Sequence, residues 1–121
     1  MNIIDAVLSN KEECIKMVIK EDADLNIKDM DTGFTALHYC AQNHDFLTAK
    51  TLMEAGAKVD EKDTYGNTPL FKAVFFSKGE TDLIKLLLAF NANPDEKNNA
   101  GVSPRELASS ITNFNVSNCF K

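Results

Sequence analysis

Two short motifs recur along this chain of 121 residues at almost the same interval, and no other feature constrains its fold as strongly. Gly33-Phe34-Thr35-Ala36-Leu37-His38 returns as Gly66-Asn67-Thr68-Pro69-Leu70-Phe71 and, more faintly, as Gly101-Val102-Ser103-Pro104-Arg105-Glu106. Ala23-Asp24-Leu25-Asn26 returns as Ala57-Lys58-Val59-Asp60 and as Ala92-Asn93-Pro94-Asp95. A period of 33 to 35 residues shared by two different motifs predicts a stack of similar units. Each unit then buries its apolar face against its neighbour.

The first motif carries the signals of a helix start. Its glycine can adopt the positive φ of a turn, and the hydroxyl of Thr35, Thr68 or Ser103 can accept N–H groups of the helix that follows. The proline after two of these residues suits the first helical position, where no N–H is needed. Ser103 and Glu106 also have the S-x-x-E spacing of a capping box. A first helix is therefore expected to begin after each of these hydroxyl residues.

A second helix is expected after a short turn, around residues 46–55 and 81–90. These helices should stop at Gly56 and Asn91, because glycine and asparagine tolerate the left-handed conformation at a helix C-terminus. Asp22 holds the same place in the first unit. The charged segments that lead from each stop to the next glycine are expected to form exposed, hairpin-like loops.

These motifs resemble the ankyrin repeat, whose family pattern runs G-x-T-P-L-H-x-A-A and then E-I-V-x-L-L-L-x-x-G-A-D-V-N. The resemblance covers nearly the whole chain and implies one all-α domain, residues 1–121, in which helix-turn-helix pairs with hairpin-like loops stack into a solenoid. It divides the chain into an N-terminal capping repeat, two full repeats and a C-terminal cap, at residues 1–26, 30–60, 63–95 and 98–121 respectively.

The chain also departs from the family pattern. The departures are alanine for proline at Ala36, phenylalanine for histidine at Phe71, one extra loop residue at Met30 and two extra residues between helices at Lys78-Gly79. The second-helix motif of the last unit is not recognisable in residues 111–121. Two placements stay open for Cys119 and Phe120 in this segment, which either cap the core or remain exposed.

Composition and charge argue against several classes of protein. The chain has 13 Lys and Arg against 18 Asp and Glu, a net charge of −5, and no cluster of basic residues that would favour nucleic-acid binding. No apolar stretch approaches the ~20 residues that cross a bilayer, and residues 1–10 lack the positive charge of a signal peptide. Three cysteines with no close pair argue against a disulfide framework. We therefore expect a cytoplasmic protein, and the resemblance to a capped repeat stack implies that it is monomeric on its own.

His38 and His44 are the two histidines of the chain. The resemblance gives His38 a structural role, hydrogen bonding across adjacent loops, and places Cys40 where the family has a packed alanine. His44 falls at the turn between helices, which is commonly exposed. The spacing of these three residues suits zinc poorly, and no phosphate-binding loop or nucleophile elbow occurs. We expect no enzymatic activity, metal or cofactor, and an enzyme or metal-binding protein that uses these three residues is the rival hypothesis.

The resemblance implies that another protein binds a concave surface made by the loop tips and the exposed side of each first helix. The positions expected to contact this partner are Asp31, Phe34, Tyr39, Gln42, Asn43, Asp63, Tyr65, Asn67, Lys72, Phe75 and Phe76. Four of them are large aromatic residues outside the predicted core pattern, and aromatic side chains often carry interface energy. These four are Phe34, Tyr65, Phe75 and Phe76. Tyr39 and one of the adjacent pair Phe75 and Phe76 are equally consistent with core packing.

Acidic residues surround these aromatic side chains in the expected loops. They are Asp29, Asp31, Asp60, Glu61, Asp63, Asp95 and Glu96. Acids in loops are most often solubilising charge, but an acidic rim beside aromatic anchors also speeds encounter with a basic protein. A basic partner is therefore expected.

The sequence favours a non-catalytic module that binds another protein. One hypothesis is an inhibitor, for instance a bacterial immunity protein that neutralises a basic toxin such as a nuclease. A second is a regulatory or effector adaptor that recruits a partner without inhibiting it. A fragment of a longer repeat array is a further alternative. Against this alternative stands the polar segment 112–121, which lacks the apolar run of another repeat.

Overall fold

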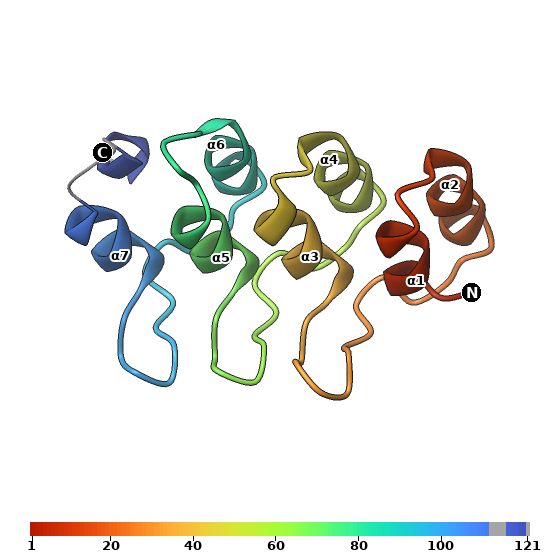
Figure 1. Cartoon of the computed structure of the whole chain (residues 1–121), viewed down its shortest axis with the longest axis horizontal. Coiled ribbons are helices and arrows are strands. Elements are labelled where there is room, and N and C mark those ends of the chain that lie inside the picture. The colour runs from red at the N-terminus through yellow and green to blue at the C-terminus, as the bar shows by residue number, and fades with distance from the viewer. Residues whose placement is uncertain (112–115, 121) are drawn as a thin grey trace.

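The computed structural model describes residues 1–111 and 116–120 and contains four helix pairs stacked side by side (Figure 1). The elements are α1 (Ile3–Leu8), α2 (Glu12–Lys20), α3 (Ala36–Asn43), α4 (Phe46–Glu54), α5 (Pro69–Phe75), α6 (Asp82–Ala89), α7 (Pro104–Ser110) and the 3₁₀ helix η1 (Val116–Phe120). The loops between pairs project from one side of the stack (Figure 1). No strand occurs in the described ranges, so the expected all-α solenoid is confirmed.

The first helix of each later pair begins where the hydroxyl residues predicted. Thr35, Thr68 and Ser103 have extended backbones, and each side-chain oxygen accepts the backbone N–H three residues ahead. The capping box expected at Ser103 is only half formed, since Glu106 donates its N–H but its side chain lies by Lys97 instead. The reciprocal box forms at α3, where a histidine takes the place of the usual acid.

The second helices end at the predicted left-handed residues. Asp22, Gly56 and Asn91 have φ of +60°, +98° and +68°. Ala57 N–H donates to the Leu52 carbonyl at 3.0 Å, the long hydrogen bond of a Schellman motif, and the other two helix ends repeat it. Both α4 and α6 lie within one residue of the expected bounds. The left-handed residue thus reverses the chain and sends it into the next loop.

The core runs along the stack, between and within the helix pairs. Leu37 and Leu70 are buried on α3 and α5, and Leu52 and Leu87 are buried on α4 and α6. Full burial of one leucine stabilises the fold by roughly 1.5–3 kcal/mol. Helix α3 packs against both α1 and α5, and α5 packs against α7. The longest helices have nine residues, and no helix in the described ranges is both long and apolar enough to cross a bilayer.

At the C-terminal end of the stack, Arg105 occupies the position that Leu37 and Leu70 hold in the preceding units. Its guanidinium pairs with Asp95, at 2.8 Å from Nε to Oδ1, and donates from Nη1 to the Phe120 carbonyl at 2.7 Å. The short helix η1 stands where the second-helix motif was unrecognisable. Phe120 and Cys119 are half-buried against the core, which decides between the two open placements. Residues 112–115 and 121 of this expected cap lie outside the described residues.

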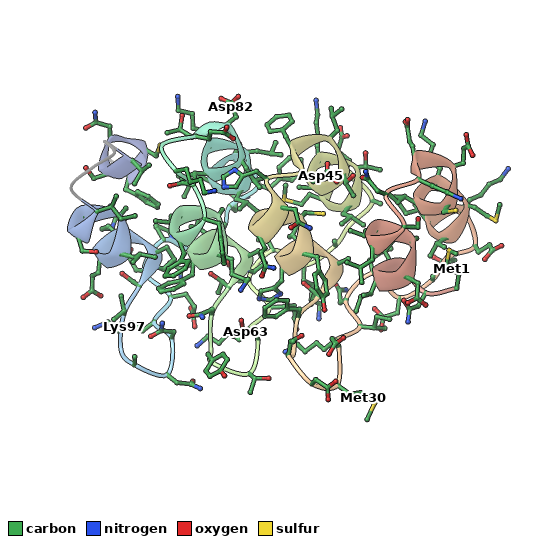
Figure 2. All side chains as sticks on the ribbon, in the orientation of Figure 1. Met1, Met30, Asp45, Asp63, Asp82 and Lys97 are labelled. Carbon is green, nitrogen blue, oxygen red and sulfur yellow. The ribbon has the colours of Figure 1, made fainter. Side chains whose placement is uncertain are left out.

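The two insertions lie where the sequence placed them. Asp29 N–H donates to the carbonyl of Phe34, five residues ahead, whereas the next loop closes from Asp63 to Asn67 over four residues. The extra residue, Met30, is fully exposed at the loop tip, as Figure 2 shows. The Lys78-Gly79 insertion lies in the turn between α5 and α6, with both residues at positive φ.

Replacing Gly66 by alanine should destabilise the protein more than the same change at Gly101. Both residues have φ near +79°, so both variants carry the strain of a left-handed alanine, about 1–2 kcal/mol. A Cβ at Gly66 would lie 2.5 Å from Oδ1 and 2.8 Å from the backbone nitrogen of Asn99, whereas at Gly101 it would meet nothing within 4 Å. Urea unfolding followed by circular dichroism measures the difference. Equal losses of stability would contradict close packing between the loops.

Candidate functional site

A buried histidine joins the start of α3 to the second loop. Nε2 of His38 donates to the carbonyl of Asn67 at 2.8 Å. Its Nδ1 accepts the backbone N–H of Thr35 at 3.0 Å, which fixes the ring orientation and the tautomer. The side chain is 0% exposed. The expected hydrogen bond across adjacent units is confirmed, and this ring is not open to a ligand.

Burial also keeps this histidine neutral. Desolvation lowers the pKa of His38 from 6.5 to about 4, although the Asn67 carbonyl and the nearby carboxylate of Asp63 oppose this shift. The neutral ring has one donor and one acceptor, and both are used in the bonds just described. His38 is therefore part of the scaffold.

The rival metal hypothesis gains no support from the geometry. Cys40 is 1% exposed, and burial raises the pKa of its thiol. His44 is half-buried, contrary to the expected exposure, and its Nδ1 lies 3.8 Å from Oε2 of Glu80. Residues 1–111 and 116–120 contain no group of three histidines, cysteines or acids placed to hold a metal ion.

An aspartate closes the tip of each of the first two loops. Oδ1 of Asp29 accepts the N–H groups of Thr32 and Asp31, which lower the pKa of its carboxyl. Asp63 does the same for Tyr65 and Asn67, at 2.9 Å in both bonds, within the second loop that Figure 2 marks. Its side chain is only 7% exposed, because the loop folds around it. Asp63 therefore does not belong to the surface that a partner reaches, which corrects the expected contact set.

Lysines link each loop to the next in a repeated pattern. Nζ of Lys28 donates to the carbonyl of Lys62 at 2.7 Å and lies 3.5 Å from Glu61. Nζ of Lys62 in turn donates to the carbonyl of Lys97 at 3.1 Å and lies 2.9 Å from Glu96. Sequence reasoning missed this ladder, although the recurrence of lysine at 28, 62 and 97 is a signal for it.

The acidic rim expected around the aromatic residues is therefore mostly used within the fold. Besides the acids already described, Asp60 accepts the N–H of Asn93, and Asp95 pairs with Arg105. The free acids gather at the first loop instead. Asp22, Asp24 and Asp31 are exposed and form no ion pair in the described part of the chain. Residues 21–34 hold five acids and one lysine, a net charge of −4.

Two of the expected aromatic anchors are exposed. Tyr65, on the second loop, is 70% exposed, and Phe75, at the end of α5, is 62% exposed. Phe76 is half-buried and packs edge to face against Phe75 with ring centroids 5.0 Å apart. These rings are not needed to fill the core.

The other aromatic residues form a half-buried cluster on the first loop and α3. Phe34 stacks on His38 at 5.5 Å and contacts Tyr39 edge to face at 5.2 Å. The hydroxyl of Tyr39 points to Asp29, with 3.4 Å between the oxygens. Phe34 was expected at an exposed loop tip, and this stacking is the reason that it is half-buried. Lys72, also expected at the surface, is 9% exposed, with its ammonium 4.0 Å from the Phe34 ring centroid.

The polar members of the expected set divide between surface and scaffold. Asn43 is exposed and Gln42 half-buried, and both line a hollow of about 440 Å³ beside Phe76 and the turn after α5. Asn67, in contrast, uses its carbonyl for His38 and its Oδ1 for Asn98 Nδ2, at 2.8 Å. Tyr65 and Phe75 are thus open surface, as is Asn43 at the end of α3.

Comparison with known proteins decides the family. A family model described as ankyrin repeats, in three copies, matches residues 3–98. The chain belongs to the ankyrin repeat family. Ankyrin repeats generally mediate protein–protein interactions, and the family is generally non-catalytic.

Relatives of this ankyrin repeat chain come from viruses, bacteria and animals. A putative ankyrin repeat protein of fowlpox virus is 30% identical over 111 residues, covering 88% of this chain and 32% of the viral protein. A putative ankyrin repeat protein of Rickettsia felis is 32% identical, covering 74% of this chain and 42% of its own length. The human SH3 and multiple ankyrin repeat domains protein 2 is 39% identical, and the match covers 69% of this chain and 4% of the human protein. The chain therefore spans less than half of each relative.

The burial of His38 predicts a pH dependence of stability. The unfolded chain takes up a proton near pH 6.5 that the folded protein takes up only near pH 4. The contribution of His38 to the free energy of unfolding should therefore be level above pH 6.5 and fall by up to about 1.4 kcal/mol per pH unit between 6.5 and 4. Urea titrations at several pH values measure it. His38→Gln should be less stable at pH 7 and lose this decline, whereas His44→Gln should keep it, and a decline unchanged in His38→Gln would contradict the assignment.

Proposed function

We propose that this ankyrin repeat chain binds another protein through a recognition face made by the loops and the first helices α3 and α5. The observation that carries the proposal is the exposure of Tyr65 and Phe75, two large rings that the fold does not use. Burying such rings against a partner gains apolar contact at a low cost in side-chain entropy. Asn43, Gln42 and Phe76 continue this face beside the 440 Å³ hollow.

The charge of the recognition face supports a basic partner at one end. Glu61, Asp95 and Glu96 of the second and third loops are paired with lysine or arginine, so these three acids contribute little net field. Asp22, Asp24 and Asp31 on the first loop are unpaired within the described residues. A basic region of the partner would meet this loop, where opposite charge speeds encounter.

Inhibition and recruitment are two forms of this function. The inhibitor hypothesis, including a bacterial immunity protein that neutralises a basic toxin such as a nuclease, draws on the acidic first loop beside exposed rings. The pairing of the other loop acids weakens any mimicry of a phosphate backbone over the full face. An adaptor would use the same side chains, so the activity of the partner inside the purified complex distinguishes the two. Loss of activity on binding supports inhibition, and full activity supports recruitment.

Truncation of the exposed rings should weaken partner binding. The partner is first identified by affinity capture from native lysate and mass spectrometry, and its affinity is then measured by isothermal titration calorimetry. Tyr65→Ala and Phe75→Ala should each weaken the affinity by about tenfold or more, as central aromatic anchors do. Leu47→Ala is the matched control, because Leu47 is 75% exposed on α4, away from the recognition face. Unchanged affinity in both aromatic variants would overturn the proposed face.

Neutralising the first loop should slow association. The double variant Asp24→Asn and Asp31→Asn should lower the association rate constant several-fold at low salt, with little effect at high salt, because screening removes the attraction. Stopped-flow mixing with the captured partner measures the rate. Glu13→Gln, an exposed acid on α2, is the control. A rate that is insensitive to salt and to the double variant would contradict a basic partner at this loop.

A further inference from the structure

Lys72 lies on the recognition face with little of its side chain exposed to water. It stands on α5 and is 9% exposed. Its Nζ lies 4.0 Å from the ring centroid of Phe34 and 5.3 Å from that of Phe76. In the described residues, no salt bridge or hydrogen bond joins this ammonium to an acceptor. The two aromatic faces are the direct attractive contacts of this cation.

No described acid or acceptor forms an ion pair or hydrogen bond with the Lys72 ammonium. Burial lowers the pKa of Lys72, and the carboxylate of Asp63 opposes this shift without reversing it. Oδ1 of Asp63 accepts two backbone N–H groups, and its buried Oδ2 has no hydrogen-bond partner among the described residues. The nearest acid therefore attracts Lys72 through space but does not bind it. An anion that contacts the ammonium directly would stabilise its charged form, which burial disfavours.

A second donor lies beside this cation. Oδ1 of Asn67 accepts from Nδ2 of Asn98 at 2.8 Å, which fixes the orientation of the Asn67 amide. Within residues 1–111 and 116–120, the two N–H groups of Asn67 Nδ2 have no hydrogen-bond partner. Asn67 and Lys72 line one hollow of about 150 Å³, whose remaining walls are Phe71, Phe75 and Phe76. The residues that line the hollow thus carry an ammonium, an amide N–H pair and three aromatic rings, and none of the described residues that line it is an acid.

We propose that this hollow, lined by Asn67, Lys72 and the three phenylalanines, binds a carboxylate, supplied by an aspartate or glutamate side chain of the protein partner. The inference rests on the proposed function and specifies the contact at the middle of the recognition face. The carboxylate accepts from Lys72 Nζ and Asn67 Nδ2, and its methylene groups pack on the rings. The partner then presents basic residues to the first loop and one acidic residue to α5.

The size of the hollow does not restrict it to one kind of side chain, so the charge of its lining residues decides which ligand it favours. A cavity of about 150 Å³ in another protein is large enough for a benzene ring. A partner's lysine or arginine is repelled by Lys72, and an apolar side chain would cover both donors without giving them an acceptor, which is unfavourable. A carboxylate satisfies both donors and keeps the apolar contacts.

A small carboxylate tests this site without the partner. 3-Phenylpropionate is titrated into ¹⁵N-labelled protein, and the side-chain amide signals of Asn67 are followed by NMR. We expect saturable shifts of these signals, and no such shifts with 3-phenylpropionamide, which lacks the charge. Lys72→Met keeps the aliphatic length and should weaken binding by about tenfold or more, since a charge-assisted hydrogen bond is lost. Lys85→Met, at an exposed position on α6, should bind as the unaltered protein does.

A second variant separates binding from folding. Asn67→Asp keeps the acceptor for Asn98 and removes the donors, so it should abolish carboxylate binding even if its stability changes little. The inference is overturned if the acid and the amide bind alike, if Lys72→Met binds as before, or if no shift occurs. Tighter binding of inorganic phosphate at the same signals would also overturn it, in favour of a phosphate-bearing ligand.

The two proposals fail separately. Loss of partner capture in Tyr65→Ala and Phe75→Ala, together with no binding of 3-phenylpropionate, would overturn only the carboxylate site. Binding of 3-phenylpropionate with unchanged capture in both aromatic variants would overturn only the proposed recognition face.

Discussion

The hydrogen bond from Nε2 of His38 to the carbonyl of Asn67 sets the distance between the first and second loops. Because the ring is fully buried, this bond forms in a medium where an unmade one is costly, so the two loops are held in one register. A backbone bond from Thr64 N–H to the Thr32 carbonyl, 3.0 Å long, follows from that register. So does the stacking of Phe34 on the same ring, which in turn places an aromatic face beneath Lys72. The centre of the recognition face thus depends on one buried imidazole.

The second and third loops are also held together by hydrogen bonds, but no histidine takes part in them. Phe71 stands at the equivalent position, and its half-buried ring has no polar atom to bridge to the third loop. The bridge is made by Asn98, whose Nδ2 donates to Oδ1 of Asn67, together with a backbone bond from Asn99 N–H to the Tyr65 carbonyl. The polar contact between these two units is therefore made by a loop residue, whereas between the preceding two it is made by His38 on a helix. It leaves Phe71 as one wall of the hollow beside Lys72, so the departure from the family pattern and the proposed carboxylate site have one cause.

The helices, their limits and the role of His38 could be predicted because they depend on residues close in sequence or on the repeated pattern. Thr68 caps its helix three residues ahead, and Gly56 ends a helix by its own backbone conformation. The fate of the loop acids could not be predicted in this way. Glu96 is paired because Lys62, 34 residues earlier, reaches across a contact that exists only once the loops are stacked. Phe34 is half-buried for a similar reason, since its partner ring becomes a partner only when the loop folds over α3.

The same loops hold the stack together and form part of the proposed recognition face, but different side chains serve these two roles. Charges that recur with the period of the stack find partners in the neighbouring unit, because equivalent positions lie next to each other. A side chain that breaks the period has no such neighbour and is left for other contacts. Tyr65 and Phe75 are exposed, and Lys72 faces rings where Tyr39, its counterpart in the preceding unit, makes a hydrogen bond. Specificity in this chain is therefore expected from the few residues at which its units differ, while the residues that repeat hold those differences in place.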